Sequence, residues 1–313
     1  MELKQINEQE MLLSDKLSPK LKKVHFITHF LFNRFQFPGS RKLGRMISNF
    51  VLPPLKGKVF TPTIYNFGLC LDNSSGNEIY HLGFYEPATV HFIQNCLQPG
   101  QTFIDVGSSI GIMTFTSALC IGTKGKVFAF EPNPQRFENL LDGIRINGFS
   151  NIKAVNLGLG KEEADMKLYH DLYSPSMVKT DASEKYNIVK VVRFVDFAKD
   201  NQIEKIDFVK IDVEGFEDQV VEGMMDFILS TNPPILCIEY LASEHGHKDH
   251  NFIDVLTETG QYKMFQFQKT SRKISKLKII KSKKDLHPAD NVYFLTDKHL
   301  DEFKDKQLFK NIE

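Results

Sequence analysis

The chain has 313 residues, 42% of them apolar, which is enough for one large domain with a continuous core and an added element. Its 39 basic and 39 acidic side chains give a formal net charge of zero, so nothing global favours a nucleic-acid partner. The four cysteines are far apart in the sequence and form no Cys-x-x-Cys pair, so we expect reduced, buried thiols. The first residues are polar, and no run approaches the ~20 apolar residues that a membrane-spanning helix needs. We therefore expect a cytoplasmic protein.

Residues 1–85 are predicted to form an N-terminal segment distinct from the rest. One or two helices are expected in the first 50 residues, where a lysine-bearing stretch precedes the aromatic run Phe26–Phe35. We favour a packing element that covers the rest of the chain or a partner in a homodimer. A basic, aromatic helix lying on an anionic membrane surface is the alternative.

A β-hairpin is predicted between Val59 and Glu86. Short extended runs occur at Thr63–Tyr65 and Gly68–Leu71, and the polar break Asp72–Asn77 separates them from Glu78–Leu82. A glycine-containing polar break between two such runs is typical of a hairpin.

Residues 86–313 are predicted to form an α/β domain. Short apolar runs alternate with helix-length segments, which indicates βαβ units and a Rossmann-like, seven-stranded, mainly parallel sheet with helices on both faces. Asn133 followed by Pro134 suits a helix start. The lysine-rich stretch from Lys269 to Lys284 is expected to be a solvated loop. The predicted strands are 102–106, 126–130, 152–156, 208–211, 235–239, 263–268 and 292–295, and the predicted helices are 110–120, 134–147, 216–229 and 251–259.

The strongest motif runs from Phe103 to Gly111, an apolar strand that enters a glycine loop before a helix. Gly107 and Gly111 let the backbone pass close to a ligand, and the helix start offers amide groups. The third glycine of a dinucleotide fingerprint is missing, which argues against a pyrophosphate. Asp105 at the strand end would repel phosphate, but it suits a cationic amino-acid tail or a sulfonium.

Glu131 ends the next strand. A carboxylate there can accept hydrogen bonds from both hydroxyls of a ribose, as in dinucleotide sites. Together, Asp105 and Glu131 indicate a nucleoside with a cationic tail. The alternative interpretation is that Glu131 only faces solvent at a strand end.

Three ordered motifs resemble the FkbM family of methyltransferases, over roughly Tyr65 to Tyr240. They are Asp105–Gly111, Phe130–Pro134 and Lys210–Glu217, and the upstream Gly83–Pro87 also looks like a segment of that family. The sequence departs from the usual family pattern at Ser108, Ser109, Val195 and Phe216. The last two bear on pocket shape and substrate.

The resemblance implies an S-adenosylmethionine-dependent O-methyltransferase that acts on a hydroxyl of a small molecule or glycan. It implies that Asp105, Gly107 and Gly111 approach the methionine part of the cofactor and that Glu131 approaches its ribose. Asp212 would lie at the end of the fourth strand, beside the transferable methyl. Ser109, Pro132 and Asn133, which flank these residues in the motifs, complete the expected cofactor site.

Asp212 and Glu214 are the candidate bases, because they flank Val213 in an extended segment and would point to the same side. Together they could instead bind a hard cation, but a divalent metal is not favoured because the sequence does not locate a third carboxylate. Glu239, at the end of a later strand, is a further candidate. Glu86 could bind the cofactor amino group or a substrate hydroxyl, or it could be a helix-start charge. The histidines of residues 244–250 match no closed zinc site and are expected in a solvent loop.

Two other functions remain open from the sequence. A nicotinamide-dependent oxidoreductase would share a related fold, and the missing third glycine weakens it. A methyltransferase-like scaffold would bind cofactor or a partner without turnover, and the presence of Asp105, Glu131, Asp212 and Glu214 counts against it.

Overall fold

The computed structural model describes Lys23 and residues 57–72, 77–170, 175–178, 185–241, 251–268, 276–310 and 312. The helices and the membrane contact predicted for the first 50 residues lie outside this part of the chain, as does the histidine-bearing stretch 244–250. Within it, none of the helices combines the length and apolar character needed to cross a bilayer.

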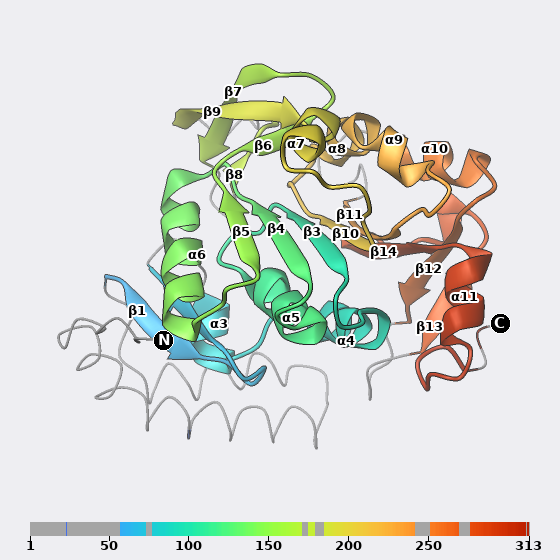
Figure 1. The fold of residues 1–313 in the computed structure, drawn as a ribbon, viewed down its shortest axis with the longest axis horizontal. Coiled ribbons are helices and arrows are strands. Elements are labelled where there is room, and N and C mark those ends of the chain that lie inside the picture. Colours follow the sequence, from blue (N-terminus) through green and yellow to red (C-terminus); the bar gives the residue numbers. More distant parts are fainter. Residues whose placement is uncertain are drawn as a thin grey trace.

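An eight-stranded sheet forms the centre of the molecule (Figure 1). The five strands from β11 to β5 run parallel, whereas β14, β12 and β13 are each antiparallel to their neighbours. All seven predicted strands are present, so the mainly parallel Rossmann-like sheet is confirmed with one strand more than expected. In spatial order the strands are β13 (Leu277–Ile280), β12 (Lys263–Phe267), β14 (Asp290–Leu295), β11 (Ile235–Tyr240), β10 (Phe208–Ile211), β3 (Thr102–Val106), β4 (Lys126–Phe130) and β5 (Ile152–Val155).

The additional strand, β13, lies in the stretch that was predicted to be a loop, so that part of the prediction was wrong. Leu277 and Ile280 are buried, while Lys278 between them is exposed. β13 pairs with β12 at the edge of the sheet, where lysines protect a strand from pairing with other chains. The lysines that made the segment look like a loop are therefore typical of an edge strand.

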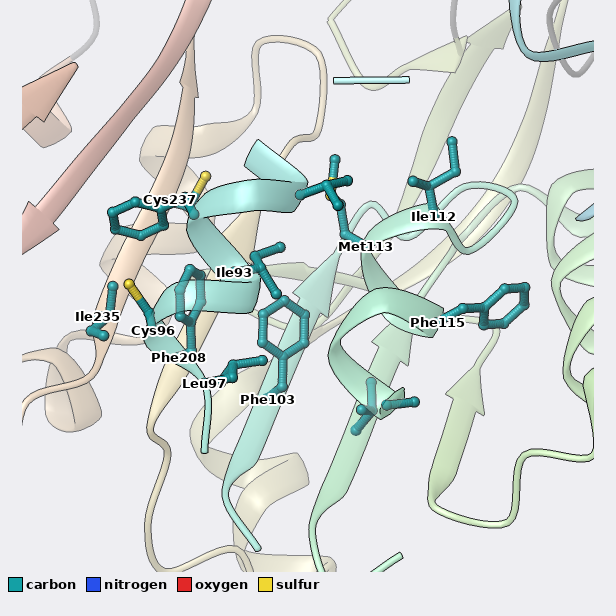
Figure 2. Close-up of a cluster of buried hydrophobic side chains, with 14 of the residues drawn as sticks. Ile93, Cys96, Leu97, Phe103, Ile112, Met113, Phe115, Phe208, Ile235 and Cys237 are labelled. Atoms are coloured by element: carbon teal, nitrogen blue, oxygen red, sulfur yellow. The ribbon is translucent and has the colours of Figure 1, made fainter. Parts of the chain in front are cut away.

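Helices cover both faces of the sheet, as predicted. Successive strand residues point to opposite faces, so Phe103 and Ile104 of β3 belong to different cores. Figure 2 shows part of the first core, in which α4 and α5 pack on β3, β10 and β11. The second core lies under α7, α8 and α10. These helices are α4 (Pro87–Cys96), α5 (Ile112–Ile121), α7 (Phe194–Asp200), α8 (Glu217–Gly223) and α10 (Phe252–Glu258).

One predicted helix has the expected bounds, and another is divided in two. α6 (Pro134–Asn147) has the predicted bounds, and the Asn133 side chain caps it by accepting hydrogen bonds from the backbone N–H groups of residues 135 and 136. The helix predicted at 216–229 is divided at Met224 into α8 and α9 (Met225–Ile228). α11 (Asp297–Phe303) and the helices α4 and α7 had not been predicted.

The predicted thiol state of the cysteines fits the structure. All four are free, and Cys70, Cys96 and Cys237 are buried, whereas Cys120 is partly exposed.

The β-hairpin exists, but its second strand is not the one expected. β1 (Val59–Pro62) pairs antiparallel with β2 (Gly68–Leu71), and Asn77–Leu82 is the helix α3. The run Thr63–Tyr65, predicted to be extended, is the turn. The Thr63 hydroxyl oxygen accepts a hydrogen bond from the Tyr65 N–H, a local bond that competes with strand pairing.

A second, four-stranded sheet lies next to α7 and α8 (Figure 1) and was not predicted. α8 packs closely on β6, because a Cβ added to Gly223 would lie 2.1 Å from the Gly160 carbonyl oxygen. In spatial order the strands are β6 (Gly158–Gly160), β9 (Tyr186–Arg193), β7 (Ala164–His170) and β8 (Pro175–Ser176).

Asn147 joins the hairpin to α6, so its removal should destabilise the fold. Its side-chain carbonyl accepts a hydrogen bond from the Gly68 N–H at 2.9 Å, and its amide donates to the Gly68 carbonyl at 2.8 Å. We expect Asn147→Ala to lower the free energy of unfolding by ~1–3 kcal/mol in urea denaturation. Asn95→Ala is the control, because the Asn95 side chain donates to the His91 carbonyl of its own helix. Equal stability of the two variants would contradict this role.

Candidate active site

The loop after β3 closes directly onto the end of β10. Gly107 has φ 81°, and a Cβ there would lie 1.8 Å from the Asp212 carbonyl oxygen. Only glycine fits this contact, because a side chain would collide with backbone. From the sequence, we expected Gly107 to let a ligand approach the backbone. The structure shows that glycine is also needed here because the loop contacts the backbone of Asp212.

Gly111 also meets protein atoms. It has φ 97° at the start of α5, and a Cβ there would lie 2.7 Å from side-chain carbons of both Leu140 and Phe115. The glycine therefore allows α5 and α6 to pack against each other beneath the loop.

Asp105 lies beneath the same loop. It is 2% exposed and accepts a hydrogen bond of 2.5 Å from the Thr114 hydroxyl of α5. Burial raises the pKa of Asp105 to about 6, although the hydrogen bond from Thr114 and the charge of Lys210 oppose the shift. Asp105 is thus a buried carboxyl with a raised pKa beneath the loop after β3.

Glu131 connects the loops that follow β3 and β4. It is 5% exposed, and its two carboxylate oxygens accept hydrogen bonds from the Ser109 N–H at 2.7 Å and the Asn133 N–H at 2.9 Å. Burial raises its pKa, and Arg136 is the main opposing influence. The interpretation of Glu131 as a solvent-facing carboxylate was wrong, because the side chain is enclosed by backbone donors.

Two further side chains hold this region. Arg136 of α6 donates to the Ser109 hydroxyl at 3.3 Å, and Asn156 donates to the carbonyls of Glu131 and Pro132 at 2.8 and 3.2 Å. Sequence reasoning missed both. Arg136 occupies an ordinary surface position in the helical pattern, so no local signal marked it.

The loop after β10 carries Asp212 and Glu214. Glu214 has φ 56°, a strained conformation for a residue with a side chain, and its carbonyl accepts a hydrogen bond of 2.7 Å from the Ser176 hydroxyl of β8. The fully buried Glu217 accepts hydrogen bonds of 3.1 Å from the N–H groups of both Val213 and Gly215. The loop is therefore held from α8 on one side and from the second sheet on the other.

Phe216, which departs from the family pattern, follows this loop. A Cβ added to Gly160 of β6 would lie 3.3 Å from the Phe216 ring. Phe216 therefore packs toward β6 and the second core.

Asp212 is bonded to Lys210, which the sequence analysis did not single out. The Lys210 ammonium lies 2.8 Å from an Asp212 carboxylate oxygen. Burial acts to raise the pKa of Asp212, but the charge and hydrogen bond of Lys210 and a hydrogen bond with Glu239 outweigh it and lower the pKa. Asp212 is therefore a carboxylate at neutral pH.

The pKa of Glu239, in β11, is shifted in the opposite direction from that of Asp212. Burial, followed by repulsion from Asp212, Glu214 and Glu217, raises its pKa well above the ordinary value. Carboxylate oxygens of Glu239 and Asp212 lie within 4.8 Å of each other, so the titrations of the two groups are coupled. Sequence reasoning placed Glu239 on this edge, and the structure brings it into contact with Asp212.

Glu86 lies at the start of α4, as the interpretation of a helix-start charge predicted. Its side chain also interacts with the charges of Lys210 and Asp212. Its carboxylate accepts a hydrogen bond of 3.0 Å from Asn291 of β14, whose amide also donates to the Thr89 hydroxyl at 3.0 Å. Burial raises the pKa of Glu86, Lys210 lowers it, and Asp212 raises it. Glu86 therefore belongs electrostatically to the same cluster as Asp212.

Among the described residues, carboxylate oxygens of Asp212, Glu214 and Glu239 all lie within 4.8 Å of one another. Glu239 thus supplies the third carboxylate that the sequence did not locate. The ammonium of Lys210 lies beside this cluster, 2.8 Å from an Asp212 carboxylate oxygen.

A comparison with protein families matches residues 105–264, about half of the chain, to the methyltransferase FkbM domain. The chain belongs to this family. The matched range includes the loops after β3, β4, β10 and β11, and so most of the carboxylates described above.

Two curated relatives carry methyltransferase names. The hexuronic acid methyltransferase AglP of Haloferax volcanii is 31% identical over 134 residues, which cover 41% of this chain and 52% of AglP. Methyltransferase 1 of Beauveria bassiana is 26% identical over 162 residues, 43% of this chain and 65% of that protein. The aligned regions thus span between half and two thirds of these relatives.

Among solved structures, a methyltransferase FkbM from Methylobacillus flagellatus KT is 15% identical, with a TM-score of 0.43 over 72% of this chain and 56% of that one. An O-methyltransferase from Bacillus cereus in complex with SAH is 11% identical, with a TM-score of 0.41 over 67% and 81% of the two chains. Scores at this level carry no argument about activity.

The raised pKa of Asp105 should appear in the pH dependence of stability. The folded group binds its proton up to a pH of about 6, against 3.8 ordinarily, so its contribution to folding falls as pH rises through this window. We expect the stability of the wild type relative to Asp105→Asn to fall by roughly 3 kcal/mol between pH 3.5 and 7 in urea denaturation. Thr114→Val, which keeps the carboxyl, is the control. A difference that does not change with pH would contradict the assignment.

Proposed function

We propose that the protein is an S-adenosylmethionine-dependent O-methyltransferase that transfers a methyl group to a hydroxyl of a small molecule or glycan. The observation that carries the proposal is the closeness of the Asp212 and Glu239 carboxylates, whose oxygens lie within 4.8 Å of each other, in a domain of the FkbM methyltransferase family. The pair provides an ionised carboxylate and a place for one proton beside the loops expected to hold the cofactor.

The cofactor side of the site rests on Glu131 and Asp105. Glu131 joins the loops after β3 and β4, and in this proposal its carboxylate accepts hydrogen bonds from the hydroxyls of the ribose. The negative charge of the edge suits a sulfonium and an ammonium, and Asp105, Asp212 and Glu86 supply it from three elements. In this proposal Gly107, Ser109 and Gly111 form the loop under the methionine part, and Pro132 and Asn133 flank the ribose.

The sulfonium methyl is already electrophilic when the cofactor is bound, so the chain's own residues must orient the acceptor and remove its proton. S-adenosylmethionine would supply the methyl group and leave as adenosylhomocysteine, and the Asp212 carboxylate would take the proton of the acceptor hydroxyl. Orientation can contribute ~7–11 kcal/mol at best, and a positioned base typically adds ~10²- to 10⁴-fold. Glu214 is the alternative base.

The acceptor class is supported by a relative rather than by the site. AglP is named a hexuronic acid methyltransferase and aligns over 134 residues of this chain. A hydroxylated sugar or a comparable small molecule is therefore the first acceptor class to test.

The direct test is transfer of label from S-adenosylmethionine to a panel of glycans, including hexuronic acids, and hydroxylated metabolites. We expect label on a hydroxyl oxygen, and the same rate in EDTA, since the proposal needs no metal. Cofactor binding with no transfer to any acceptor would favour a binding scaffold. Binding of nicotinamide cofactors instead would indicate an oxidoreductase.

Glu131→Ala should weaken cofactor binding, because it removes a carboxylate that the ribose hydroxyls would bond. Loss of hydrogen bonds to a charged group costs about 1.5–3 kcal/mol, so calorimetry should give a roughly 10- to 100-fold weaker Kd for adenosylhomocysteine. Glu138→Ala is the control, because Glu138 is an exposed carboxylate on α6. An unchanged Kd in Glu131→Ala would overturn the assignment of the ribose site.

Asp212→Asn should reduce turnover more than affinity, because the amide keeps the shape of the side chain but accepts no proton. We expect kcat to fall by ~10²- to 10⁴-fold, with the Kd for adenosylhomocysteine changed much less. Glu214→Gln is the matched variant for the alternative base. A larger loss of kcat in Glu214→Gln than in Asp212→Asn would assign the base to Glu214.

A further inference from the structure

Lys210 is a lysine in the interior of the central sheet. It lies in β10 between Val209 and Ile211, and it is 1% exposed. Lysine is almost never fully buried unless its charge is paired. Lys210 lies at the same edge of the sheet as the carboxylates of the candidate site, which suggests that it has a role in that site.

The partners of Lys210 come from several elements. Its ammonium lies 2.8 Å from an oxygen of Asp212, two residues later on the same side of the strand. The side chains that face it electrostatically are Glu86 before α4, Asp105 of β3, Asp212 after β10, Cys237 and Glu239 of β11, and Tyr85. Lys210 is thus a buried positive charge that interacts with acidic groups from several elements.

We propose that Lys210 is a positioning residue for methyl transfer, whose ammonium holds one carboxylate oxygen of Asp212 and so orients the other oxygen toward the acceptor's hydroxyl. This rests on the proposed function. Lys210 touches neither cofactor nor acceptor in this role and acts through Asp212 alone.

The protonation states around Lys210 agree with this role. Burial lowers the pKa of Lys210, but Asp212, Cys237, Glu86 and Glu239 together raise it well above the ordinary value, so the ammonium keeps its proton. An ammonium has three donors and no acceptor, which excludes Lys210 as the base. Without this charge, Asp212 would face Glu239, Glu214 and Glu86 as one of four close acidic groups.

A structural ion pair is the competing explanation, and buried pairs often contribute little net stability. A double-mutant cycle separates the two roles. We would measure kcat, KM and the Kd for adenosylhomocysteine in Lys210→Met, Asp212→Asn and the double variant. The double variant removes both charges together, so it remains informative if Lys210→Met alone does not fold.

If Lys210 acts through Asp212, each single variant loses kcat by ~10²- to 10⁴-fold, and the double variant loses no more than Asp212→Asn. Lys210→Arg, which keeps the charge, should recover part of kcat relative to Lys210→Met. Losses that multiply in the double variant, or wild-type kcat in Lys210→Met, would overturn the proposal.

An acceptor-independent measurement keeps this inference separate from the proposed function. ¹³C NMR of carboxyl-labelled protein, with the Asp212 signal assigned from Asp212→Asn, follows the ionisation of Asp212 directly. In Lys210→Met we expect the Asp212 titration to move up by about one pH unit or more. If the Asp212 titration shifts but the protein methylates no acceptor, the pairing of Lys210 with Asp212 stands and the methyltransferase proposal is rejected. If the Asp212 titration is unchanged in Lys210→Met, the proposed role of Lys210 is rejected.

Discussion

The crowding of acidic side chains at one edge of a buried sheet is the constraint on which the site depends. Asp105, Asp212 and Glu239 end or follow neighbouring strands, so parallel pairing brings them together whatever their separation in the chain. Like charges in a poorly hydrated place cannot all ionise. The charge of Lys210 lowers the pKa of Asp212, while burial and the neighbouring carboxylates raise the pKa of Glu239.

The backbone around this edge is held in conformations that residues with side chains rarely adopt. Ser109, Glu214 and Glu86 have φ of 50°, 56° and 40°, and each lies in or next to a loop of the site. Such strain persists only where the surroundings fix it. Glu131 holds the first loop, and Glu217 with Ser176 holds the second. The site is therefore built from loops that the two sheets and their helices fasten in place.

The sequence predicted the parallel strands closely because each is a short apolar run between turn residues. It missed β7, β9 and β13, in which exposed lysines interrupt the apolar residues, and it missed β6 and β8, which are only three and two residues long. In β9, Tyr186 and Ile188 are also exposed. It located Asp212, Glu214 and Glu239 from their strand ends. It did not identify Lys210, because a lysine within an apolar run gives no sign that its partners lie on other strands. Arg136 and Asn291 were missed for the same reason.

The central claim is that this acidic edge is shaped for a sulfonium nucleoside. A crystal structure of the protein with adenosylhomocysteine tests it most directly. We expect the ribose hydroxyls to bond Glu131 and the sulfur to lie on the side of Asp212, above the loop of Gly107. Electron density for adenosylhomocysteine elsewhere, with this edge vacant or filled by another ligand, would contradict it.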